Sequence, residues 1–86
     1  MPWEVVITRV AEKDLARLPA DVRRDVERAL DELAADPGGA DLKKLKGRRS
    51  RWRLRVREWR VTLLFDSSRG IIYAESVDPR VGAYRG

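Results

Sequence analysis

Hydrophobic residues follow a helical spacing in the first half of the chain and a strand spacing in the second. Apolar side chains recur every three or four positions between residues 22 and 34, which predicts one amphipathic helix. This helix should end at the Asp-Pro-Gly-Gly sequence of residues 36–39. A shorter helix is expected over residues 11–18, before Pro19, and the β-branched run within residues 3–8 predicts a strand.

The second half alternates between apolar and polar positions. In residues 51–57, the two sides of the expected strand consist of Trp52, Leu54 and Val56 and of Arg53, Arg55 and Arg57. Residues 59–65 and 71–77 predict two more strands, separated by a turn at residues 66–70 and ended by Asp78-Pro79. Together the elements predict an α+β fold in the order β-α-α-β-β-β. We expect one domain over residues 1–86, in which a helical hairpin packs on one face of an antiparallel four-stranded sheet.

A two-residue turn at Arg57-Glu58 would fix how the first two of these strands pair. On the apolar face, it would place Val56 opposite Trp59, Leu54 opposite Val61 and Trp52 opposite Leu63. On the other face, Arg55 would lie directly across from Arg60, with Arg53 diagonal to it. Adjacent guanidinium groups repel each other, but an anion bound between them would make the arrangement favourable. The planar fork of arginine matches the oxygens of a phosphate.

Composition narrows the chemistry that is open to the chain. It contains neither cysteine nor histidine, so disulfides, thiolate metal sites and histidine bases are excluded. Any catalysis must use Arg, Lys, Tyr, Asp or Glu, and we expect no metal and no cofactor. The sequence shows no signal peptide, and no run reaches the roughly 18 apolar residues that a membrane span needs. We therefore expect a cytoplasmic protein without a membrane partner.

Charge is concentrated in one segment. Residues 42–60 carry 10 basic residues and one acidic residue, for a net charge of +9, whereas residues 1–41 have a net charge of −4 and residues 61–86 of 0. A block of one sign indicates a partner of the opposite sign. The candidate RNA-binding residues of this segment are Lys43, Lys44, Lys46, Arg48, Arg49, Arg51, Arg53 and Arg55.

Two plainer interpretations compete with this one. Arginines on an outward hairpin face also keep an edge soluble, and they can pair with Asp or Glu from elsewhere in the chain. The aromatic residues Trp3, Trp52, Trp59 and Phe65 fall on apolar faces, so we expect them in the core and not in a base-stacking surface.

The ordered set of motifs resembles the RelE/ParE superfamily of bacterial toxins over nearly the whole chain. The segments that carry the resemblance are a strand, then the A-x-K-D-L-x-x-L-P segment of residues 11–19, a helix ending in Asp-Pro, Leu45-Lys46-Gly47, Trp52-Arg53-Leu54-Arg55-Val56, Trp59-Arg60-Val61, Asp66, and Pro79-Arg80-Val81-Gly82-Ala83-Tyr84-Arg85.

The resemblance implies the toxin of a type II toxin–antitoxin system. RelE-type members cut mRNA in the ribosomal A site by attack of the 2′-hydroxyl on the adjacent phosphate, without a metal. It also implies catalytic roles for Arg60, Arg80 and Tyr84, with Arg53, Arg55 and Arg85 as RNA-binding residues. The implied partners are a cognate antitoxin with an acidic or amphipathic segment, the ribosome and mRNA.

The chain departs from the family where a proton acceptor is needed. Strongly cleaving members often carry Lys on the first hairpin strand, whereas this chain has Arg53 and Arg55, which do not lose a proton. Tyr84 remains a candidate base if neighbouring arginines stabilise its phenolate, with Lys46 as the second choice. Pro79 also stands where many members have His. Two alternatives stay open: a ParE-type inhibitor of DNA gyrase, and a non-catalytic relative that only binds an antitoxin.

Overall fold

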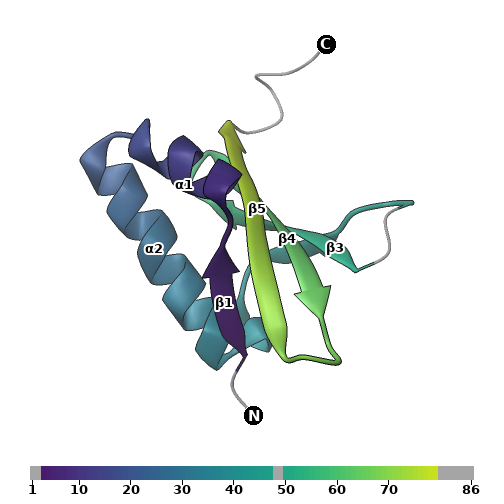
Figure 1. Cartoon of the computed structure of the whole chain (residues 1–86). Coiled ribbons are helices and arrows are strands. Elements are labelled where there is room, and N and C mark those ends of the chain that lie inside the picture. The colour runs from purple at the N-terminus through teal and green to yellow at the C-terminus, as the bar shows by residue number, and fades with distance from the viewer. Residues whose placement is uncertain (1–2, 48–49, 80–86) are drawn as a thin grey trace.

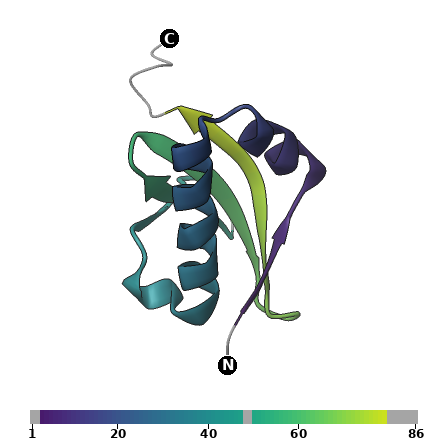
Figure 2. The ribbon, with the colours of Figure 1, turned by 90° about the vertical axis from the view of Figure 1, so that its left-hand side faces the viewer.

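The structure, a computed structural model, describes residues 3–47 and 50–79. Its strands form one mixed sheet in the order β1-β5-β4-β3-β2. They are β1 (Glu4–Ile7), β2 (Leu42–Lys44), β3 (Arg51–Val56), β4 (Trp59–Asp66) and β5 (Ile71–Pro79). Helices α1 (Arg9–Ala16) and α2 (Ala20–Ala35) come between β1 and β2, and a 3-10 turn at Pro37–Gly39 follows α2. The long helix α2 runs along one face of the sheet (Figures 1 and 2).

The predicted α+β fold is confirmed, but the predicted four-stranded antiparallel sheet is wrong in two respects. The sheet has a fifth strand, β2, which pairs antiparallel with β3. Three residues are too few to show an alternating pattern, so the sequence does not predict this strand. In addition, β1 runs parallel to β5. That pairing joins two segments that are far apart in the sequence. Local hydrophobic patterns carry no information about which distant segments pair.

The third error concerns the length of the last strand. The sequence predicts that Asp78-Pro79 ends this strand, whereas β5 continues through both residues. Its neighbour β1 pairs only as far as Ala74, so beyond that point β5 has a strand on one side alone. Proline is tolerated at such an edge because no ladder hydrogen bond is lost there.

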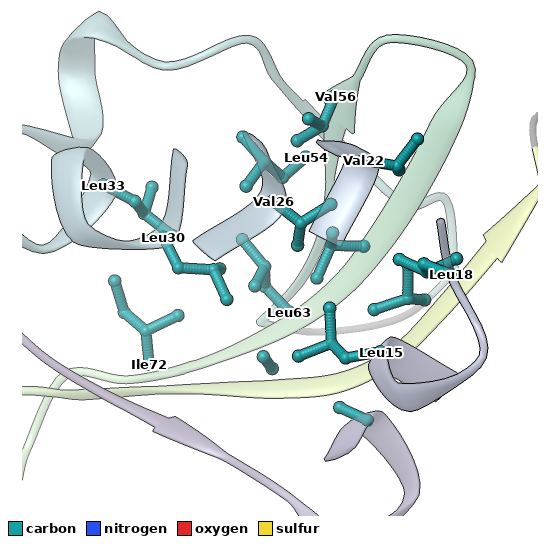
Figure 3. Close-up of a cluster of buried hydrophobic side chains, with 14 residues drawn as sticks. Leu15, Leu18, Val22, Val26, Leu30, Leu33, Leu54, Val56, Leu63 and Ile72 are labelled. Atoms are coloured by element: carbon teal, nitrogen blue, oxygen red, sulfur yellow. The ribbon is translucent and has the colours of Figure 1, made fainter. Parts of the chain in front are cut away.

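Buried side chains from both helices meet one face of the sheet. Figure 3 shows Leu63 of β4 among residues of the helices, with Val26 and Leu30 of α2 nearby. The four aromatic residues expected in the core are partly buried and pack against this cluster. Phe65 joins two of them, with ring centroids 5.3 Å from Trp3 and 5.9 Å from Trp52. In the described part of the chain, neither α-helix is long and apolar enough to cross a membrane.

A β-bulge in β5 is anchored to α1. Thr62 pairs with Ser76 and Leu63 with Ala74, so Glu75 between them has no partner on β4. The Asp14 carboxylate accepts the backbone N–H of Val77 at 2.9 Å, just beyond the bulge. On the other side of the bulge, the Thr8 hydroxyl caps α1 and donates to the carbonyl of Ala74 at 3.0 Å. These contacts fix both the position of α1 and the course of β5.

The β3–β4 turn lies at Arg57-Glu58, as predicted, and is tied to α2. Arg57 has a φ of 57°, a conformation that two-residue hairpin turns require but that a non-glycine residue adopts at a cost. Its guanidinium bonds to Asp21 at 3.2 Å and to Asp25 at 2.8 Å. The alternating pattern predicted that Arg57 lies on the same face as Arg53 and Arg55. Its side chain instead joins the turn to helix α2.

The bond from Arg57 lowers the pKa of the Asp21 carboxyl below its ordinary value of 3.8. A carboxyl with a lowered folded-state pKa stabilises the fold above its unfolded pKa, and the effect is lost as the pH falls through the folded value. We therefore expect wild type to melt slightly above Asp21→Asn at neutral pH. The gap should close below about pH 4. Circular dichroism melts at several pH values would check this, and an unchanged gap at low pH would contradict it.

Candidate nucleic-acid interface

The sheet face turned away from the helices, here called the open face, carries the arginines of the hairpin. The observed register of β3 and β4 matches the predicted one at every pair, including Arg55 opposite Arg60. Arg53 lies opposite Thr62 and therefore diagonal to Arg60. Lys43 of β2 lies opposite Arg53 and extends the same surface. We call Lys43, Arg53, Arg55 and Arg60 the cationic cluster.

Exposure differs among the members of this cluster. Lys43 and Arg55 are exposed, whereas Arg53 and Arg60 are half-buried within the sheet surface. Neighbouring strands lie about 5 Å apart, so Arg55 and Arg60 start from adjacent positions on a rigid ladder. The Arg55 guanidinium also donates to the carbonyl of Arg57, at 3.5 Å. Guanidinium groups held in this way can donate several hydrogen bonds to one phosphate group.

The structure separates other basic residues from the cluster. Arg51 shares the open face, but it forms a two-point ion pair with Glu75, with N–O distances of 2.9 and 3.1 Å. This contact raises the pKa of the Arg51 guanidinium, and the Glu75 carboxylate offsets its positive charge. Lys44 pairs with Trp52 in the register, and its ammonium group lies 5.6 Å from the centre of that ring.

The remaining predicted residues fall into two groups. Lys46 lies exposed in the turn after β2, outside the sheet. The other five are outside the residues that the structure describes, namely Arg48, Arg49, Arg80, Tyr84 and Arg85. The structure thus brings Lys43, Arg53, Arg55 and Arg60 together, and it leaves the roles of the tail residues as predictions from the family resemblance.

Sequence reasoning missed the acidic and hydroxyl groups on the open face. Beyond the bulge, Ser76 lies opposite Thr62 and Asp78 lies opposite Arg60. The Ser76 hydroxyl donates to the Asp78 carboxylate at 3.3 Å. An unbroken alternation from Ile72 would have turned Asp78 toward the helices, so only the bulge places it here. Within residues 3–47 and 50–79, no three acidic side chains converge closely enough to hold a metal ion.

Most of the chain is similar in fold to solved toxin structures. No protein-family model and no curated protein matches it. It is 24% identical to a chain of the RelBE2 toxin–antitoxin complex from Mycobacterium tuberculosis, with a TM-score of 0.81 over 93% of this chain and 100% of that one. For the archaeal RelE–RelB complex from Pyrococcus horikoshii, the identity is 26% and the TM-score 0.79 over 93% and 97% of the two chains.

A third similar structure is a YoeB/ParE toxin from Agrobacterium tumefaciens, at 18% identity and a TM-score of 0.74 over 91% of this chain and 99% of that one. More than 90% of this chain and of each matched chain is covered, so the likeness includes both the helices and the sheet. The RelE/ParE-type fold predicted from the ordered motifs is thereby confirmed.

Proposed function

We propose that this chain, which has the fold of the RelE/ParE toxins, is the toxin of a type II toxin–antitoxin system and cuts mRNA on the ribosome. One observation carries the proposal: Arg55 and Arg60 lie directly opposite each other on an open sheet face, with Arg53 and Lys43 beside them. Four cations on one rigid surface suit the closely spaced phosphates of an RNA backbone.

The cluster would act on the charge that develops during cleavage. As the 2′-oxygen attacks the phosphorus, the non-bridging oxygens gain negative charge, and fixed cations stabilise that state more than the starting phosphodiester. Arg60 is central in the cluster because it lies between Arg55 on β3 and the end of β5. Arg53 and Lys43 would hold flanking phosphates, and Arg80 and Tyr84 would join them from the tail, as the family resemblance implies.

The proposed protein partner is an antitoxin with an acidic or amphipathic segment. Structures from M. tuberculosis and P. horikoshii that resemble this chain are toxin–antitoxin complexes. An acidic segment of a partner could neutralise the cationic cluster that would otherwise bind RNA. Neutralisation by such a segment would block the RNA-binding surface itself.

Induced expression in bacteria would test the proposed activity. We expect translation to stop at once, and primer extension on abundant transcripts should show new 5′ ends within open reading frames. A DNA-damage response without new ends would instead indicate gyrase inhibition. Normal growth with retained binding of the antitoxin encoded beside it would indicate a non-catalytic relative.

The Arg51–Glu75 ion pair leads to a prediction about salt. Glu75→Gln should release Arg51 to contact RNA, so the affinity for single-stranded RNA should rise at low salt. The plot of log affinity against log salt should also steepen, by up to about 0.7 for one added phosphate contact. Fluorescence anisotropy with a labelled oligonucleotide measures both quantities.

Glu27→Gln is the matched control for this measurement. It adds the same charge at an exposed position of α2, away from the open face. Equal slopes for the two variants would mean that only net charge matters, and that Arg51 does not reach RNA after its release.

A further inference from the structure

Two carboxylates of β5 share the open face with the cationic cluster, and their surroundings differ. Glu75 is held by two bonds from the Arg51 guanidinium, at 2.9 and 3.1 Å. Asp78 instead accepts a bond from a neutral group, the Ser76 hydroxyl, at 3.3 Å. Asp78 is half-buried on this face.

The sheet places Asp78 directly beside the proposed phosphate site. Asp78 pairs with Arg60, and Arg60 pairs with Arg55, so the three residues form one row across β5, β4 and β3. One strand spacing of about 5 Å separates neighbouring members of the row. A phosphate bound by Arg55 and Arg60 would therefore bring the adjacent ribose within reach of the Asp78 side chain.

The local structure of β5 is built so that Asp78 takes this place. The bulge at Glu75 shifts the alternation by one residue, which turns Val77 into the core, where it is 5% exposed, and Asp78 onto the open face. The bond from the Val77 N–H to Asp14 holds the strand in this register. Bulges that redirect side chains are common beside active sites.

We propose that Asp78 is the general base of the cleavage reaction, an assignment that rests on the proposed function. Its carboxylate takes the proton of the ribose 2′-hydroxyl while the 2′-oxygen bonds to phosphorus. The bond from phosphorus to the 5′-oxygen breaks, and that oxygen leaves with the electron pair and takes a proton from water. The products are a 2′,3′-cyclic phosphate and a 5′-hydroxyl end. The arginines cannot supply the base because they do not lose a proton.

The pH dependence of single-turnover cleavage on mRNA-programmed ribosomes tests the assignment. With a carboxylate base, the wild-type rate should stay flat between about pH 6 and 9, because hydroxide is then not needed to remove the proton. Asp78→Asn should lower the rate by about 10²- to 10⁴-fold. Its residual rate should rise tenfold per pH unit, because hydroxide then has to remove the proton.

Asp66→Asn is the matched control. It makes the same change at the opposite end of the open face, where the Asp66 carboxylate accepts bonds from Ser68 and from the backbone of Arg69. An asparagine keeps an acceptor oxygen for both, so the rate and its pH profile should equal those of wild type. Melting curves would establish that Asp78→Asn, which retains an acceptor for Ser76, is folded.

Four results would overturn the assignment of Asp78, and they differ from one another. If Asp78→Asn cuts as fast as wild type, the carboxylate does not contribute to the rate. If the variant cuts more slowly but keeps the flat wild-type profile, Asp78 only positions Arg60. If the wild-type rate itself rises tenfold per pH unit, another group such as Tyr84 is the base. If wild type leaves ribosome-bound mRNA intact, the proposed function fails and the base assignment falls with it.

Discussion

Replacing Arg60 with alanine should reduce the rate of mRNA cleavage by about 10²- to 10³-fold, the usual cost of losing one fixed donor to a developing oxyanion. Arg60 lies on the central part of the sheet, opposite both Arg55 and Asp78. Its loss removes the cation nearest to the reacting phosphate in the proposed arrangement. Rapid-mixing assays with programmed ribosomes would measure the rate, and primer extension would give its counterpart in cells.

Two further variants make this experiment specific. Arg60→Lys keeps the charge but loses the planar fork, so its rate should fall between those of wild type and Arg60→Ala. Arg24→Ala removes the same charge from an exposed position of α2 and should leave the rate unchanged. If Arg24→Ala were as impaired as Arg60→Ala, the charge of the whole molecule would matter and the cluster on the open face would not.

The hairpin at the centre of the site could be predicted from the sequence because two independent signals agreed. Alternation assigned each residue of β3 and β4 to a face, and the position of the two-residue turn fixed the register between them. Together these signals predict that Arg55 lies opposite Arg60, and the sheet has that pair. The resemblance to RelE/ParE toxins added the expected roles of these residues.

The acidic half of the site could not be predicted, because it depends on a break in the same alternation. Glu75 adds one residue to β5, and the sequence around it, Ala-Glu-Ser-Val, gives no sign of a bulge. The bulge is held by contacts from Asp14 and Thr8, more than 60 residues earlier in the chain. Long-range contacts of this kind also set the parallel pairing of β1, which was missed for the same reason.

Arg51 and Arg57 show why charge along the chain overstates the charge of the site. Both belong to the segment with a net charge of +9, yet each is bound by carboxylates from other elements. Arg51 is bound by Glu75 of β5, and Arg57 by two aspartates of α2. The cationic cluster is the part of the segment that the fold gathers on the open face.

The same helical contacts that anchor β5 make the site sensitive to the core. Asp14 and the buried residue Leu15 lie on α1, so the helix that packs on the sheet also holds the strand that carries Asp78. Loosening of the core should therefore affect the geometry of the cluster before the chain unfolds completely. Variants with lowered stability should lose cleavage at temperatures below their melting point.

Leu63→Ala should be among the most destabilising single changes, with a loss of about 2–5 kcal/mol of unfolding free energy. Leu63 is 0% exposed on β4 and faces α2 (Figure 3). A domain of this size has on the order of 5–10 kcal/mol in total. The melting temperature should therefore fall by at least about 10 °C. Urea unfolding followed by circular dichroism would give the change in free energy.

The adjacent residue provides a control that differs only in the face of the sheet. Leu64 is half-buried on the open face, opposite Arg51 and Tyr73. Leu64→Ala deletes the same atoms but leaves no enclosed cavity, so its cost should stay near or below about 1.5 kcal/mol. A Leu64→Ala variant as unstable as Leu63→Ala would mean that this face is covered as tightly as the helical one. The cationic cluster would then lie under a layer of protein. RNA could bind to the cluster only after that layer had moved away.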